Sequence, residues 1–290
     1  MPMTLIQGDF QALNGEPDGD SIRFYPTNVK DWDAIPGPHK IRPNHSGGAQ
    51  LRFDGVDALE THYPSLHGGL GITHQPPQFA GAAAARVLSW LGFKGVTRSA
   101  DQKVTASTPT QAPGYILSRT ADKYGRCVAF VFKGRAPARS SSLVNFGVPM
   151  LRQSLNYDLL VKGMAYPTFY TKLYPDIRRA MTAAVAGARQ KKTGLWPSDE
   201  TTKGFRVASA NTLENRDVIM PKLFRRLVDY LAINDGNSSL RGFKNYLASK
   251  DDRLFVISTG HSTGFDYVVD VQGQRVNLTR PPEDLLFVEG

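Results

Sequence analysis

The chain has 290 residues, of which 41% are apolar and 21% charged, so it can form one large globular domain or two ordinary ones. It has no run of about 18 or more apolar residues and only one cysteine, Cys127, which excludes a membrane-spanning helix and an internal disulfide bond. The net charge is +9, and the excess lies entirely in residues 1–197, with 23 Lys and Arg against 13 Asp and Glu; this suits a polyanionic partner, although solubility alone would also explain it.

The first part of the chain is expected to form strands and loops. Residues 5–26 alternate in polarity around the turn-forming segment NGEPDGD and predict a β-hairpin. Residues 27–49 are rich in Pro, Gly, Asn and His and predict a long loop. Residues 51–62, LRFDGVDALETH, begin as a strand with apolar Leu51 and Phe53 in alternation, yet they also carry one arginine and three carboxylates. Buried charges are costly unless they are paired or bind a metal, so this stretch is a candidate functional segment.

The middle of the chain combines helices with a group of strands. Prolines at the start, an alanine run and helical spacing of apolar residues predict a helix over residues 76–93. Similar patterns predict helices over residues 148–164 and 174–196. Short apolar runs predict three strands at residues 103–108, 114–119 and 126–132.

A hydrophilic segment after Trp196 marks an expected domain boundary. We expect a first domain over residues 1–197 and an accessory C-terminal mixed α/β domain, of unknown role, over residues 198–290. The second is predicted to contain helices at 221–233 and 239–249 and short strands at 253–258, 265–271 and 274–278. The whole pattern indicates the α+β class, and an OB-fold barrel is one of several folds that it permits.

Three short segments concentrate charged residues: PDGDS, the stretch 51–62, and DKYGRCVAF. Hydrolysis of a phosphodiester needs oxygen ligands for a hard cation such as Ca²⁺ or Mg²⁺. It also needs a carboxylate that acts on the attacking water and arginines that stabilise charge on the phosphoryl oxygens. The three segments contain all of these groups. Each segment alone also has an ordinary interpretation: a hairpin turn, a surface ion pair, or a polar turn before a strand.

In their order along the chain, the blocks DGDS, RFDGVDALET, DKYGR and LVKGMAY…ARQKKTGLW resemble the staphylococcal nuclease, or thermonuclease-like, family. The resemblance covers roughly residues 9–197 and keeps the spacing from Arg52 through Asp57 to Glu60. It implies a five-stranded OB-fold β-barrel with flanking helices. It also implies Ca²⁺-dependent hydrolysis of DNA and RNA at the bond to the 5′-oxygen, which leaves 3′-phosphates.

By position, the resemblance assigns Asp20 and Asp57 as carboxylate metal ligands and the backbone carbonyl of Ala58 as a third ligand. It implies that Glu60 acts on the attacking water. Arg52 and Arg126 would hold the phosphate and stabilise the transition state. Mg²⁺ or Mn²⁺ could replace Ca²⁺ as the metal ion.

The same resemblance places Lys123 and Tyr124 along the bound nucleotide. Two departures concern the site. The family usually has Thr-Pro where this chain has Ala58-Leu59, and Phe169 stands where a tyrosine stacks on the nucleotide base.

Two other functions remain open. The chain could be a non-catalytic OB-type module that binds nucleic acid without cutting it, with a C-terminal domain that recruits a protein partner. The C-terminal domain could also gate the active site. The N-terminal residues lack the basic and long apolar regions of a secretory signal, so we expect a cytoplasmic protein, although a secreted mature chain would look the same. We expect its partner to be DNA or RNA, and we expect no association with a membrane.

Overall fold

The computed structural model describes residues 1–65 and 69–289, and its largest element is a closed ring of strands. The strand order is β11-β1-β2-β3-β10-β9, and β1 also pairs with β9, so the sheet closes on itself. The predicted α+β class is confirmed, and β1 and β2 form the predicted antiparallel pair. The sheet consists of β1 (Pro2–Gln11), β2 (Arg23–Pro26), β3 (Ala49–Phe53), β9 (Gln111–Ala121), β10 (Cys127–Lys133) and β11 (Leu143–Asn145).

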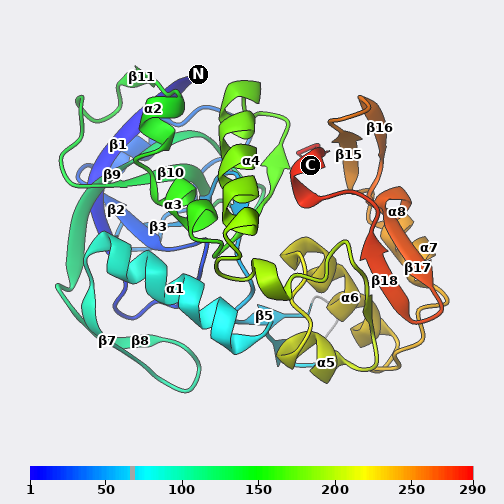
Figure 1. Ribbon diagram of the computed structural model, residues 1–290. Coiled ribbons are helices and arrows are strands. Elements are labelled where there is room, and N and C mark those ends of the chain that lie inside the picture. Colours follow the sequence, from blue (N-terminus) through cyan, green and yellow to red (C-terminus); the bar gives the residue numbers. More distant parts are fainter. Residues whose placement is uncertain (66–68, 290) are drawn as a thin grey trace.

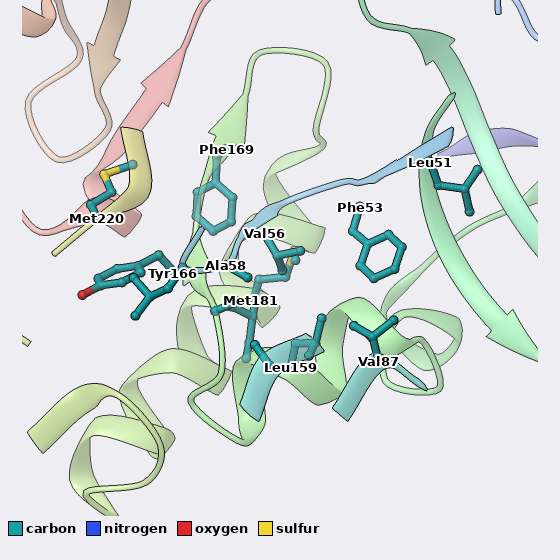
Figure 2. Packing of buried hydrophobic residues seen from close by; sticks show 14 of the residues in the cluster. Leu51, Phe53, Val56, Ala58, Val87, Leu159, Tyr166, Phe169, Met181 and Met220 are labelled. Atoms are coloured by element: carbon teal, nitrogen blue, oxygen red, sulfur yellow. The ribbon is translucent and has the colours of Figure 1, made fainter. Parts of the chain in front are cut away.

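Strand β3 shows how the ring separates its apolar and charged residues. Successive side chains of a strand point to opposite faces. Ala49, Leu51 and Phe53 are therefore buried together, while Arg52 lies on the other face and is partly exposed. Figure 2 shows Leu51 and Phe53 in the interior with Val87 from a neighbouring helix.

Three helices share the hydrophobic core of the ring. They are α1 (Pro77–Leu91), α3 (Leu155–Val161) and α4 (Pro175–Gln190). Each contributes buried apolar residues to the core, among them Val87, Leu159 and Met181 (Figure 2). Helix α1 begins at a proline and ends at Gly92, which has the positive φ of a C-terminal cap.

The prediction of one helix over residues 148–164 is wrong. The chain forms α2 (Val148–Leu151) and then α3, with a break between them. The hydroxyl of Ser154 accepts a hydrogen bond from the backbone N–H of Tyr157 (3.2 Å) and caps the new helix. A serine can cap a helix as well as sit within one, so apolar spacing alone did not reveal the break.

Shorter elements connect the main ones. The predicted loop 27–49 contains a short 3-10 helix with Asn28 as its N-cap. The short elements are η1 (Val29–Ala34), β4 (Val56–Asp57), β5 (Tyr63–Pro64), β6 (Ile72–Thr73), β7 (Lys94–Arg98), β8 (Val104–Thr108), β12 (Tyr166–Pro167), β13 (Phe169–Tyr170) and η2 (Trp196–Ser198).

Residues after Ser198 form helices and two small sheets. One sheet has the order β13-β19-β15-β16 and the other β14-β18-β17. The strand predicted over residues 265–271 is wrong in its first half, because residues 265–268 form the short helix α8. The elements are β14 (Phe205–Arg206), α5 (Ala210–Asn215), α6 (Pro221–Ile233), α7 (Phe243–Ser249), β15 (Arg253–Val256), β16 (His261–Gly264), α8 (Phe265–Val268), β17 (Val269–Gln272), β18 (Arg275–Leu278), η3 (Pro282–Asp284) and β19 (Leu285–Phe287).

The C-terminal region is joined to the ring side of the molecule by direct contacts. Figure 1 shows α4 between the ring and the C-terminal strands. Strand β19 pairs in parallel with β13, which comes from the first part of the chain. The Tyr166 hydroxyl donates a hydrogen bond to Asp199 Oδ1 (2.8 Å), and Arg189 forms an ion pair with Glu283. The division into domains at residue 197 stays a prediction.

Among residues 1–65 and 69–289, no helix combines the length and the apolar character that crossing a membrane requires.

Candidate active site

A cluster of ion-paired side chains lies where β3 and β4 meet the DGD turn. Arg52 comes from β3, and its Nη1 donates a hydrogen bond to Asp20 Oδ2 (3.2 Å). Its Nη2 donates another to Asp57 Oδ1 (2.9 Å), on β4. The Asp57 side chain is fully buried, and those of Arg52 and Asp20 are 16% and 11% exposed. The structure therefore brings together three residues that the sequence assigned to one site.

The DGD turn is packed tightly against the second half of this site. Gly19 separates Asp18 from Asp20, and a Cβ atom added to it would lie 2.4 Å from Ala58 Cβ and 2.7 Å from Ala83 Cβ. Such distances are well inside van der Waals contact. The position of Asp20 thus depends on small residues at 19, 58 and 83.

Glu60 is held by its backbone and by its neighbours, although the chain has no proline at residue 59. Ala58 and Leu59 are buried and fix the segment before it. The Glu60 N–H donates to Gln75 Oε1 (3.3 Å), and its carbonyl accepts from the Gln75 N–H (2.9 Å). Gln75 Nε2 in turn donates to the carbonyl of Ile219 (2.8 Å), in the C-terminal region. A fully buried glutamine therefore stabilises this turn.

The sequence analysis missed one member of the cluster, Arg225 on α6. Its Nη2 donates to Asp57 Oδ2 (2.8 Å), and its Nη1 lies 3.3 Å from Asp57 Oδ1 and also bonds Glu60 Oε1. Arg225 follows the site segment by more than 160 residues and lies within the ordinary pattern of an amphipathic helix, beside Arg226. Nothing in the local sequence distinguishes one of these arginines from the other.

The ionisation of these groups reflects burial and close charges. Burial alone would raise the pKa of Asp57, but the guanidinium groups of Arg225 and Arg52 outweigh it and hold that pKa well below its usual range. Burial raises the pKa of Asp20 to about 6, against the opposing effect of Arg52 and with help from Asp57. Burial also raises the pKa of Glu60 and that of Asp18. Burial, helped by repulsion between neighbouring carboxylates, therefore favours the protonated forms of Asp18, Asp20 and Glu60.

Arg126 lies close to the cluster without bonding to its carboxylates. Its Nε donates to Asp122 Oδ2 (2.7 Å), within the turn between β9 and β10. Its charge still lowers the pKa of Asp20. Lys123 and Tyr124 are exposed on the same turn, and Lys123 Nζ lies 5.5 Å from the centre of the Tyr124 ring. These side chains form a basic and aromatic edge beside the cluster.

The prediction that Phe169 stacks on a nucleotide base is wrong, because its side chain is fully buried. Figure 2 shows it among apolar residues that include Val56 and Tyr166. Neighbouring residues of a strand face opposite sides, so Tyr170 points the other way; it is partly exposed and influences the pKa of Arg52. That alternation is the signal in the sequence that could have identified Tyr170 as the more exposed of the two aromatic residues.

The site fits a hard divalent cation in the chemistry of its donors, but two guanidinium groups share the same oxygens. All candidate donors are oxygen atoms, and four acidic side chains, Asp18, Asp20, Asp57 and Glu60, meet two arginines. Within the described part of the chain, no three His, Cys, Asp or Glu side chains are already arranged as a metal-binding group. The excess negative charge favours a cation, and Arg225 covers the oxygens of Asp57.

Comparisons with known proteins matched one family model and two fungal proteins named as endonucleases. A family model described as staphylococcal nuclease homologue matches residues 50–198, just over half of the chain. The chain is 25% identical over 201 residues to proteins named probable endonuclease lcl3 from Aspergillus flavus and Aspergillus oryzae. The match covers 65% of this chain and 58% of each relative, so the chain spans less than two thirds of the length of these relatives.

Proposed function

The chain belongs to the staphylococcal nuclease homologue family, and from this premise we propose that it is a nuclease that hydrolyses phosphodiester bonds of DNA, RNA or both. The observation that carries the proposal is the convergence of Arg52, Asp57 and Glu60 beside Asp20. In this proposal, Arg52 is the cation for a phosphate, Asp20 and Asp57 are oxygen ligands for a metal, and Glu60 is the general base. The name of the related fungal proteins, probable endonuclease, supports the same class of activity.

The residues have distinct roles in this proposal. Glu60 accepts a proton from the attacking water or orients it, and its raised pKa suits a general base. Arg52 binds the phosphate through the paired N–H groups of its guanidinium fork. Arg126 binds the phosphate in the same way once it leaves Asp122. Cleavage at the bond to the 5′-oxygen would leave a 3′-phosphate.

Asp20, Asp57 and the carbonyl of Ala58 would hold the Ca²⁺ that we propose as cofactor, with Mg²⁺ or Mn²⁺ as alternatives. A bound divalent cation polarises the phosphate and offsets its charge. Both oxygens of Asp57 already accept hydrogen bonds from guanidinium groups, so a metal ion bound to Asp57 would lie close to a fixed cation.

We further propose that the closed ring is an OB-type barrel and that nucleic acid lies along its charged edge. Lys123 and Tyr124 are exposed there, and Tyr170 replaces Phe169 as the aromatic residue that meets the nucleotide. Aromatic rings stack on bases with little sequence preference, and lysines bind the phosphate backbone.

Hydrolysis of single-stranded DNA and of RNA, measured with Ca²⁺ and then with a chelator, tests the proposal. We expect cleavage that the chelator stops, and we expect Glu60→Gln to reduce it by about 100-fold or more, the usual contribution of a general base. Analysis of the product ends reports whether 3′-phosphates form. Full activity in chelator, or full activity of the Glu60→Gln variant, would contradict this mechanism.

The alternative, a binding module without catalysis, is favoured by one observation: both carboxylate oxygens of Asp57 already accept hydrogen bonds from arginines. It predicts salt-sensitive binding of DNA or RNA with no cleavage under Ca²⁺, Mg²⁺ or Mn²⁺. Residues 198–290 would then recruit a protein partner. Filter binding and gel analysis on the same samples separate the two functions.

A further inference from the structure

Arg225 crosses from the C-terminal region into the proposed catalytic cluster. It bonds both oxygens of Asp57 and one oxygen of Glu60, the proposed ligand and the proposed base. Its side chain is 21% exposed, and those of Asp57 and Glu60 are 0% and 13% exposed. The guanidinium is therefore a nearly buried cation placed against the carboxylates that a metal would use.

The helix that carries Arg225 is firmly docked. Leu223, Phe224 and Leu227 of α6 are fully buried. The Phe224 ring meets Tyr63 with their centres 6.5 Å apart, and the Tyr63 hydroxyl donates to Asp229 Oδ2 (3.0 Å) on the same helix. Any displacement of the guanidinium would therefore come from rotation of the Arg225 side chain, because the packed helix holds the backbone in place.

Arg225 changes the net charge of the carboxylate cluster. The four carboxyl groups of the cluster, Asp18, Asp20, Asp57 and Glu60, carry four formal negative charges, and Arg52 alone would leave a net charge of −3. Arg225 reduces that formal net charge to −2 and occupies oxygens of two of the four carboxyl groups, those of Asp57 and Glu60. A metal ion entering the cluster would meet repulsion from a close cation and would compete with its hydrogen bonds for the same oxygens.

We propose that Arg225 is a tethered counter-cation that competes with the divalent metal for Asp57 and Glu60 and so weakens metal binding at the active site. It is a positioning residue, acting through these two carboxylates and not on the substrate. The proposal rests on the proposed function, because it takes the cluster to be a metal site. The C-terminal region would thereby set the metal concentration at which the enzyme becomes active.

Isothermal titration of the full-length, metal-stripped protein with CaCl₂ tests the proposal directly. We expect Arg225→Gln to bind Ca²⁺ about tenfold tighter or more, since a nearby charge at such distances is worth at least one factor of ten in affinity. The matched control is Arg226→Gln, which changes the next residue of α6. Arg226 pairs with Asp252, which keeps Lys222 as a partner, so the Ca²⁺ affinity of this variant should stay that of the wild type.

Thermal unfolding of the same proteins gives a second readout. Without Ca²⁺, Arg225→Gln should unfold at a lower temperature than the wild type, because Asp57 and Glu60 lose a buried counter-charge. With saturating Ca²⁺, its melting temperature should rise by more than that of the wild type. If the Gln variant does not fold, Arg225→Lys serves in its place. A lysine keeps the charge but cannot bond both oxygens of Asp57. The Arg225→Lys protein should therefore bind Ca²⁺ more tightly than the wild type.

Unchanged or weaker Ca²⁺ binding in the folded Gln or Lys variant would overturn the proposal, as would absence of binding in every variant. The outcome is separable from that of the nuclease assay. Tighter Ca²⁺ binding without cleavage would support the role of Arg225 and contradict the nuclease. Cleavage with a Ca²⁺ affinity that does not depend on Arg225 would do the opposite.

Discussion

Gly19 shows how closely the positions of single residues control the candidate site. It lies between two aspartates, and its backbone rests on Ala58 and Ala83. Ala58 has a small side chain, which matches the tight packing of the turn. The geometry of the site therefore depends on the small residues Gly19, Ala58 and Ala83 as well as on its charged residues.

Replacing Gly19 with alanine should move Asp20 and reduce nuclease activity. The new Cβ would lie 2.4 Å from Ala58 Cβ, which is too close, so the turn or the helix below it must shift. A displacement of about 1 Å at a catalytic site can cost on the order of 100-fold in rate. Steady-state cleavage of single-stranded DNA measures the effect. Gly81→Ala on α1, where an added Cβ meets no atom within 4 Å, is the control; equal activity of the two variants would contradict the expectation.

Sequence and structure agree best on residues that lie close together along the chain. Arg52, Asp57 and Glu60 were predicted as a group because they fall within nine residues, and the structure places Arg52 against Asp57. Phe169 was assigned to the wrong face, because a short aromatic segment does not show which of its residues points inwards. Arg225 could not be predicted, since its partners are 165 and 168 residues away.

Among the elements, α6 connects the two parts of the chain. Most of it is buried, and two of its arginines have different partners: Arg225 pairs with Asp57 and Glu60, and Arg226 pairs with Asp252. Lys222 also pairs with Asp252 (2.9 Å). Burial alone would raise the pKa of Asp252, but its bonds with Arg226 and the charge of Lys222 lower it below the ordinary value of 3.8.

Asp252→Asn should therefore destabilise the protein near pH 7 by roughly 2 kcal/mol, the typical effect of losing hydrogen bonds to a charged group. A carboxyl group with a lowered pKa stabilises the fold above its ordinary pKa, and this contribution is lost as the pH falls through the lowered value. The difference between wild type and variant should be full at about pH 7 and shrink below about pH 4. Urea unfolding at several pH values measures it; a difference that persists unchanged in acid would contradict the assignment.

On the scale of the whole molecule, the C-terminal region shares a sheet with the first part of the chain. Strand β19 pairs with β13, and ion pairs join Lys172 to Glu289 and Arg189 to Glu283. Gln75 and Ile219 are linked by a buried hydrogen bond close to Glu60. These contacts cross the boundary that the sequence predicted at residue 197. They favour residues 198–290 folding together with the first part of the chain.

We expect the full chain to unfold in a single cooperative transition. Separation of the C-terminal region would expose Phe169 and Tyr166 and would leave Asp57 without one of its arginines, so neither part should be stable alone. Calorimetry together with tryptophan fluorescence tests this, because coincident transitions by the two methods indicate one unit. Two separate transitions would instead support a domain boundary at residue 197.

The sequence alone predicted the strands of the ring other than β11, the family resemblance and the local charged group from Arg52 to Glu60. It could do so because strand alternation, helix spacing and motif spacing are properties of neighbouring residues. The burial of Phe169 and the ion pairs of Arg225 with Asp57 and Glu60 became visible in the tertiary structure alone. Both facts depend on how α6 and β19 pack against the first part of the chain, and such long-range packing places residues together that no local pattern connects.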